Sequence, residues 1–170
     1  MLNHYGVDPL SVYTEMREEQ KVAFLSTIGH MDFFSNYVAV AFVFFAVLFV
    51  KEKEWKKAVW KAIPMTVAGV SIASSPADTG FLAVILFFAL GWVLLRHLME
   101  LARFFLVAAL LFAGYFTMGR LDLLFSTGKA LDGLSGYLIH TPLTGIAACI
   151  AACFAGGIAY WYQKRGAQCS

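Results

Sequence analysis

The sequence predicts an all-α, polytopic integral membrane protein, and two features of its composition support this fold class. Of its 170 residues, 60% are hydrophobic and 14% are charged, whereas soluble domains average about 45–50% apolar and about 25% charged residues. The apolar runs are continuous rather than alternating, which disfavours a membrane β-barrel. We therefore expect one membrane domain over residues 1–170 and no water-soluble enzyme, disordered chain or nucleic-acid-binding protein.

About five apolar runs are long enough to cross a bilayer as helices, because a span needs roughly 18–20 residues. The runs 33–50 and 80–98 are strongly apolar, whereas 58–75 is weaker because it contains Lys61 and Pro64. The run 103–119 is a little short. The last run is rich in small residues and ends on aromatic residues that suit a membrane interface. The predicted helices are 33–50, 58–75, 80–98, 103–119 and 142–162.

The distribution of Lys and Arg predicts the orientation, since these residues favour the cytoplasmic side. With the N-terminus outside, the cytoplasmic segments 51–61, 96–103 and 163–170 hold nine of the thirteen basic residues. The C-terminus is then cytoplasmic. The outer face collects residues 1–32, a tight turn after the second helix, and a loop over 120–141 that is rich in Gly, Ser and Asp.

Several polar side chains fall at this outer face. His30 and Asp32 precede and open the first predicted helix, and a neutral imidazole there is suited to act as a general base. The alternative is that His30, like His140, is a plain hydrogen-bonding residue at an interface. Asp78 either caps the third predicted helix or contributes to an outer polar pocket.

A row of small residues recurs every four positions on the last predicted helix. It consists of Gly145, Cys149, Cys153 and Gly157. Small side chains at this spacing let two helices approach closely, either within this chain or against partner helices or a missing half of the protein. The two cysteines share no face with His or a carboxylate, so we expect neither a metal site nor a disulfide framework.

Three stretches resemble one known family in order and spacing. Residues 24–34 (FLSTIGHMDFF) resemble an STxGNxNFF segment, residues 2–10 (LNHYGVDPL) resemble LNxxGIDPL, and residues 74–82 (SSPADTGFL) resemble SxSDSGFL. These motifs are typical of O-antigen ligase-like and O-antigen polymerase membrane proteins. The resemblance touches most of residues 1–100.

The resemblance implies a glycosyltransferase that ligates or polymerises glycans carried on undecaprenyl diphosphate. The reaction would take place at the outer face of the cytoplasmic (inner) membrane of a bacterium, with no nucleotide sugar, metal or other cofactor. Membrane lipid and the polyprenyl-diphosphate glycan would be its partners. Because members have more membrane helices than this chain, we expect the chain to be the central part of such a protein, truncated or split.

The chain departs from the family at its site. The characteristic Asn pair is replaced by His30 and Asp32, and Asp78 stands where classical ligases have an Arg suited to phosphate. The resemblance leaves His30, Asp32 and His140 as the candidate catalytic residues. Substrate-binding roles fall to Asp78, Arg120 and Lys129.

Two other functions remain open from the sequence. The small-residue row favours a non-catalytic membrane subunit that packs through the last helix. A small transporter-like helical bundle is the third hypothesis, and its weakness is that no charged residue falls near the middle of a predicted helix.

Overall fold

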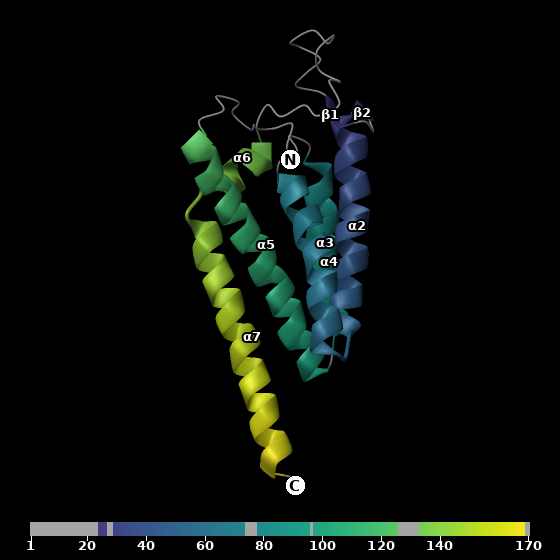
Figure 1. Cartoon of the computed structure of the whole chain (residues 1–170), viewed down its shortest axis with the longest axis vertical. Coiled ribbons are helices and arrows are strands. Elements are labelled where there is room, and N and C mark those ends of the chain that lie inside the picture. Colours follow the sequence, from purple (N-terminus) through teal and green to yellow (C-terminus); the bar gives the residue numbers. More distant parts are fainter. Residues whose placement is uncertain (1–23, 27–28, 74–77, 96, 126–132, 169–170) are drawn as a thin grey trace.

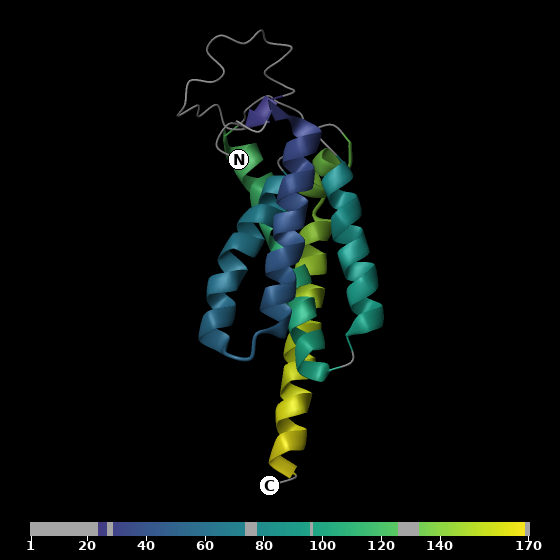
Figure 2. The ribbon, with the colours of Figure 1, turned by 90° about the vertical axis from the view of Figure 1, so that its right-hand side faces the viewer.

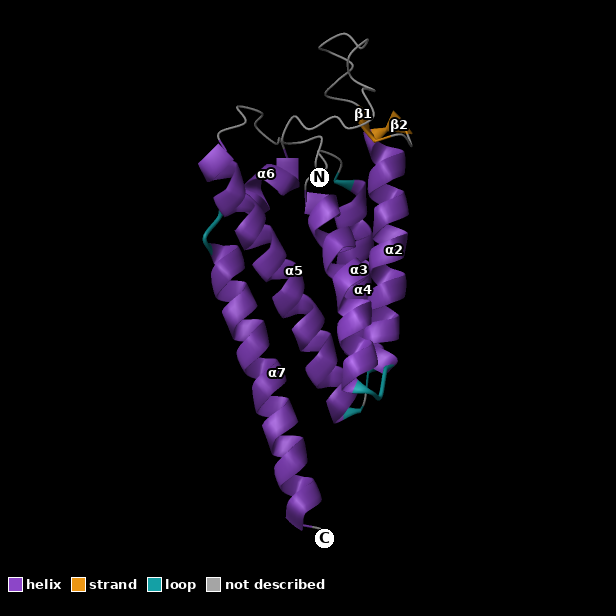
Figure 3. Cartoon of the chain, viewed as in Figure 1, coloured by secondary structure: helices purple, strands orange, loops and turns teal. Residues whose placement is uncertain are grey.

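The computed structural model describes residues 24–26, 29–73, 78–95, 97–125 and 133–168, and these residues are overwhelmingly helical (Figures 1 and 3). A short antiparallel pair of strands, β1 (Phe24–Ser26) and β2 (Gly29–His30), leads into the first helix. The helices are α2 (Met31–Lys51), α3 (Trp55–Ala73), α4 (Thr79–Leu94), α5 (Leu98–Phe125), α6 (Gly133–His140) and α7 (Leu143–Gln168).

The described chain has three helices that are long and apolar enough to cross a membrane, which indicates a membrane protein. These are α2, α5 and α7. The other two predicted spans are also helical, but α4 has 16 residues and is therefore only about 24 Å long, less than the hydrocarbon thickness of about 30 Å. Helix α3 carries three lysines and Pro64. The number of five spans and the orientation of the termini therefore stay predictions.

Successive long helices run in opposite directions (Figures 1 and 2). One end of the bundle, here called the Arg120 end, holds the strands, the start of α2 and α4, and α6. The opposite end, here called the Lys57 end, holds the turn between α2 and α3 and the start of α5. Helix α7 packs mainly against α5 and extends past the other helices at the Lys57 end (Figure 1).

The core lies among α2, α3, α4 and α5. Helix α2 presents Ala39, Phe42, Ala46 and Phe49, a series spaced three and four residues apart, and all four are buried. Helix α3 approaches it closely, because a Cβ atom at Gly69 would lie 3.3 Å from the Phe42 ring. The α2 helix is thus the centre on which the neighbouring helices are arranged.

The first turn of α4 is capped by a residue of another helix. The buried hydroxyl Oγ of Ser35, on α2, accepts a hydrogen bond from the backbone N–H of Gly80 at 3.1 Å. Asp78 occupies the N-cap position, but its side chain makes no capping hydrogen bond. The expected capping role of Asp78 is therefore wrong, because Ser35 satisfies a free N–H that an N-cap side chain would otherwise take.

The predicted outer loop over 120–141 differs in the structure. Helix α5 begins at Leu98 and continues through Arg120 to Phe125, and α6 covers Gly133–His140. Leucines favour continuation of α5 past the polar residues, and α6 buries Ile139 in the core. Gly and Ser content alone therefore overstated the loop, and Arg120 is a helical residue.

Ion pairs and a backbone contact join the segments at the Lys57 end. Lys51 at the end of α2 donates to both carboxylate oxygens of Glu100 on α5, at 2.9 Å each. Within the α2–α3 turn and α3, Lys61 pairs with Glu52 and Lys57 pairs with Glu54 at 2.7 Å. The guanidinium of Arg103 donates to the backbone carbonyl of Lys53 at 3.2 Å. The start of α5 is thereby fixed to the α2–α3 turn.

We expect Ser35→Ala to destabilise the protein by about 1–3 kcal/mol, because the Gly80 N–H would stay buried without its acceptor. Thermal unfolding in detergent measures the change. Asn36→Ala is the matched control, since Asn36 is exposed on the next position of α2 and should change the unfolding temperature little. Equal effects of the two substitutions would rule out the capping role of Ser35.

Acidification should release the Glu52 ion pair. The Lys61 ammonium, with the backbone N–H groups of Glu54 and Lys53, lowers the pKa of Glu52 from 4.5 to about 2. A lowered carboxyl pKa stabilises the fold above the unfolded value and loses that stabilisation as pH falls toward the folded value. We therefore expect the Glu52 contribution to be full above pH 4.5 and to vanish near pH 2.

Unfolding temperatures of the wild type and Glu52→Gln, compared between pH 6 and pH 2, check this expectation. The gap between the two proteins should close as the pH falls. A gap that stays constant over the whole range would show that Glu52 does not titrate in this way.

Candidate functional site

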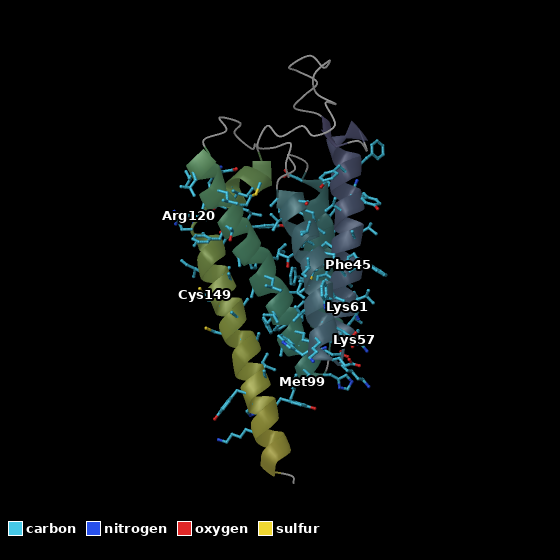
Figure 4. The ribbon with its side chains drawn as sticks, in the orientation of Figure 1. Phe45, Lys57, Lys61, Met99, Arg120 and Cys149 are labelled. Atoms are coloured by element: carbon cyan, nitrogen blue, oxygen red, sulfur yellow. The ribbon has the colours of Figure 1, made fainter. Side chains whose placement is uncertain are left out.

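The structure places most of the predicted site residues at the Arg120 end of the bundle (Figures 1 and 4). His30 ends β2, Asp32 lies in the first turn of α2, and Asp78 precedes α4. Arg120 lies near the end of α5, and His140 is the last residue of α6. Lys129 falls outside the described residues.

Two of these residues, Arg120 and His140, line one small pocket of about 230 Å³. The pocket lies where the last turns of α5 meet the turn between α6 and α7. Asp78 is not part of its lining. The residues that line it are Phe116, Gly119, Arg120, Leu123, Ile139, His140, Thr141 and Pro142.

Arg120 is positioned by a ring on its own helix. Its guanidinium carbon lies 4.9 Å from the centroid of Phe116, which is four residues earlier and therefore on the same helix face. A cation–π contact at an exposed site contributes about 0.5–1 kcal/mol. Among the described residues no carboxylate forms an ion pair with Arg120. A planar guanidinium is suited to bind an anion such as phosphate through two of its N–H groups.

His140 is positioned by the sharp turn that follows it. The N–H of Thr141 still bonds to the carbonyl of Tyr137 at 3.1 Å, but Pro142 has no N–H and cannot continue α6. Proline suits the start of a helix, and the carbonyl of Pro142 accepts from Gly145 at 3.1 Å as α7 begins. The exposed imidazole of His140 thus sits at a fixed corner between two helices.

Gly119 brings the two halves of the pocket together. A Cβ atom at this position would clash with the backbone carbonyl oxygen of Ile139, so α6 packs directly against the backbone of α5. The sequence analysis did not single out Gly119 or Phe116. The sequence held a signal for both residues: Gly119 directly precedes Arg120, and the aromatic Phe116 lies four positions before it, on the same helix face.

The pocket combines one permanent cation with one imidazole that can accept or donate a proton. Such a pair is suited to bind a phosphate-bearing ligand and to take a proton from a neighbouring hydroxyl. No group of three or more His, Cys, Asp or Glu within the described ranges could hold a metal ion.

No protein-family model, curated protein or solved structure matches this chain. The likeness to O-antigen ligase-like proteins accordingly rests on the short sequence motifs alone. Residues 2–10, which carry one motif, lie outside the described residues, and the other two are described in part. The catalytic and binding roles assigned from the resemblance stay predictions.

We expect Gly119→Ala to destabilise the protein by about 1–3 kcal/mol, the usual cost of overpacking, because α6 must move away from α5. Gly156→Ala on α7 is the matched control, since its added Cβ would meet no atom within 4 Å. This control should be neutral or slightly stabilising in a helix. Thermal unfolding in detergent compares the two, and a Gly119→Ala protein as stable as the control would disprove the close α5–α6 contact.

Proposed function

We propose that this chain is part of a membrane glycosyltransferase of the O-antigen ligase-like type, which transfers or polymerises glycans from an undecaprenyl-diphosphate carrier. The observation that carries the proposal is the shared pocket of Arg120 and His140, two residues that the sequence marked separately. A cation beside an imidazole matches a donor that leaves as a diphosphate and an acceptor that must lose a proton.

The proposal includes five membrane helices with the N-terminus outside and the C-terminus in the cytoplasm of a bacterial cell. The basic Lys57 end would face the cytoplasm, and the Arg120 end would face outward, as the distribution of Lys and Arg favours. Helices α3 and α4 would complete the five spans despite their lysines and short length, because they are packed against α2. The lipid carrier would reach the outer pocket from the membrane.

In the proposed reaction Arg120 binds the diphosphate of the donor and His140 acts as the general base. The acceptor hydroxyl attacks the anomeric carbon of the donor sugar while its proton passes to the imidazole of His140. A new glycosidic bond forms, the bond from the anomeric carbon to the phosphate oxygen breaks, and the electron pair stays on the diphosphate. Arg120 then stabilises the added negative charge on that leaving group. His30, Asp32 and Asp78, at the same end, would contact the glycan.

A second candidate is a non-catalytic membrane subunit that associates through α7. Cys149 and Cys153 are exposed, and a Cβ atom at Gly156 or Gly157 would meet nothing within 4 Å. By contrast, Gly145 already packs against the Phe116 ring, so part of the small-residue row serves the chain's own fold. In this case substitutions at the Arg120 pocket would leave the function intact.

We expect Arg120→Ala and His140→Gln each to abolish most glycan transfer in membranes that contain the protein. Loss of a general base typically lowers the rate by about 10²–10⁴-fold, and loss of the guanidinium leaves the leaving group's charge unbalanced. The measurement is transfer of a radiolabelled glycan from undecaprenyl diphosphate to its acceptor.

Lys57→Ala is the control, because it removes a cation from the opposite end of the bundle. Arg120→Lys separates charge from geometry, since a lysine keeps the charge and loses the bidentate fork. Full transfer by folded Arg120→Ala or His140→Gln protein would refute the proposed roles and favour the subunit function.

A further inference from the structure

A second hollow in the molecule lies far from the Arg120 pocket, between α2 and α4. It is a groove of about 550 Å³ whose lining is almost entirely apolar. Val43 and Val47 of α2 face Leu86 and Leu90 of α4 across it, and Phe104 of α5 lines it as well. Lys51 is the charged residue among the lining side chains.

The groove follows from how α4 is attached. Near the Arg120 end α4 is held to α2 by the Ser35–Gly80 hydrogen bond, and further along the rings of Phe42 and Phe87 touch with centroids 5.9 Å apart. Toward the Lys57 end the two helices separate (Figure 2). There Phe104 of α5 packs against Gly91 and the Phe87 and Phe88 rings of α4. The groove is therefore open along the outside of the bundle and lined by an aromatic ring inside.

Lys51 brings a positive charge to the end of the groove. Its side chain is 58% exposed and is held by Glu100, so the ammonium has a fixed position. Among the described residues, the Lys57 end carries more basic than acidic side chains. The basic ones are Lys51, Lys53, Lys56, Lys57, Lys61 and Arg103, and the acidic ones are Glu52, Glu54 and Glu100. An anion is the ligand that this arrangement of charge complements.

We propose that this groove binds one acyl chain of an anionic phospholipid, with the lipid phosphate at Lys51. The lining runs from Val43 to Lys51 on α2, about 12 Å along the helix axis, so a hydrocarbon chain can lie parallel to the helices. Basic pockets between membrane helices are sites for anionic headgroups. This inference concerns the opposite end of the bundle from the proposed glycosyltransferase site and stands independently of it.

Charge favours an anionic lipid over an apolar helix of a partner protein as the occupant, because Lys51 is among the residues that line the groove. A flexible acyl chain can lie in a narrow apolar channel, and its anionic headgroup complements the excess of basic side chains at the Lys57 end, where Lys51 lies.

Native mass spectrometry of the purified protein in detergent tests the proposal with phosphatidylglycerol and phosphatidylcholine of identical chains. The wild type should retain phosphatidylglycerol in preference to phosphatidylcholine. Lys51→Ala should weaken phosphatidylglycerol binding about fivefold, the effect of one basic residue near an anionic headgroup, and leave phosphatidylcholine unchanged. Lys57→Ala is the matched control, because Lys57 lies at the same end but outside the groove.

Two further comparisons distinguish lipid binding in the groove from general attraction to surface charge. Val47→Trp should fill the groove and reduce retention of the bound lipid, whereas Val67→Trp on the exposed face of α3 should not. Glu100→Gln should tighten phosphatidylglycerol binding by freeing Lys51, while Glu54→Gln, with the same change in net charge, should have less effect. Leu86→Trp repeats the filling test at a second position.

Several results would overturn the proposal. They are equal retention of the two lipids by the wild type, equal losses for Lys51→Ala and Lys57→Ala, and full retention by folded Val47→Trp and Leu86→Trp proteins. Displacement by free glycerol phosphate at the concentration that competes with the intact lipid would also overturn it, because the acyl chain would then contribute nothing. Thermal unfolding of each variant confirms that the compared proteins are folded.

Discussion

Close approach of neighbouring helices at glycine positions is the constraint on which the arrangement of this bundle depends. Surrounding lipid is as apolar as the side chains, so membrane helices associate by van der Waals packing rather than by a hydrophobic driving force. A Cβ atom would lie 2.6 Å from Leu111 at Gly69 and 2.5 Å from Val70 at Gly114, which fixes α3 against α5. Gly91 admits Phe104 and Gly119 admits the backbone of α6. The pocket and the groove both exist because these contacts set the helix positions.

Local sequence patterns predicted the helices whose position depends on the apolar run itself. They failed where a contact with a residue distant in the sequence determines the structure. Each of the five predicted apolar runs falls largely on a helix of the described chain, since length and hydrophobicity are properties of the run itself. Capping of α4 was one of the two roles expected for Asp78, but Ser35, 45 positions away from Gly80, supplies the acceptor. The Gly- and Ser-rich character of 120–141 concealed α6, whose helix is stabilised by burying Ile139. Arg120 and His140 were each predicted from the sequence, whereas their place in one pocket depends on the contact between α5 and α6 at Gly119.

The charges at the two ends of the bundle are used differently. At the Lys57 end each described carboxylate has a lysine partner, as in the Lys51–Glu100 pair that ties α2 to α5. These pairs are solvated and individually weak, so together they position the turn more than they stabilise it. At the Arg120 end the described contact of the guanidinium is an aromatic ring. A ring does not neutralise the guanidinium, so this contact is compatible with an anionic ligand.

Helix α5 extends from the Lys57 end to the Arg120 end, so its length sets the distance between them. It has 28 residues, and Glu100 and Arg120 lie twenty positions apart on it, which is about 30 Å along a helix. This separation equals the hydrocarbon thickness of a typical bilayer, so the two charged ends can reach the two interfaces at once. Arg103, three positions after Glu100, donates a hydrogen bond to the backbone carbonyl of Lys53 at the same end of the bundle. A lipid at Lys51 and a ligand at Arg120 would therefore bind near opposite ends of α5.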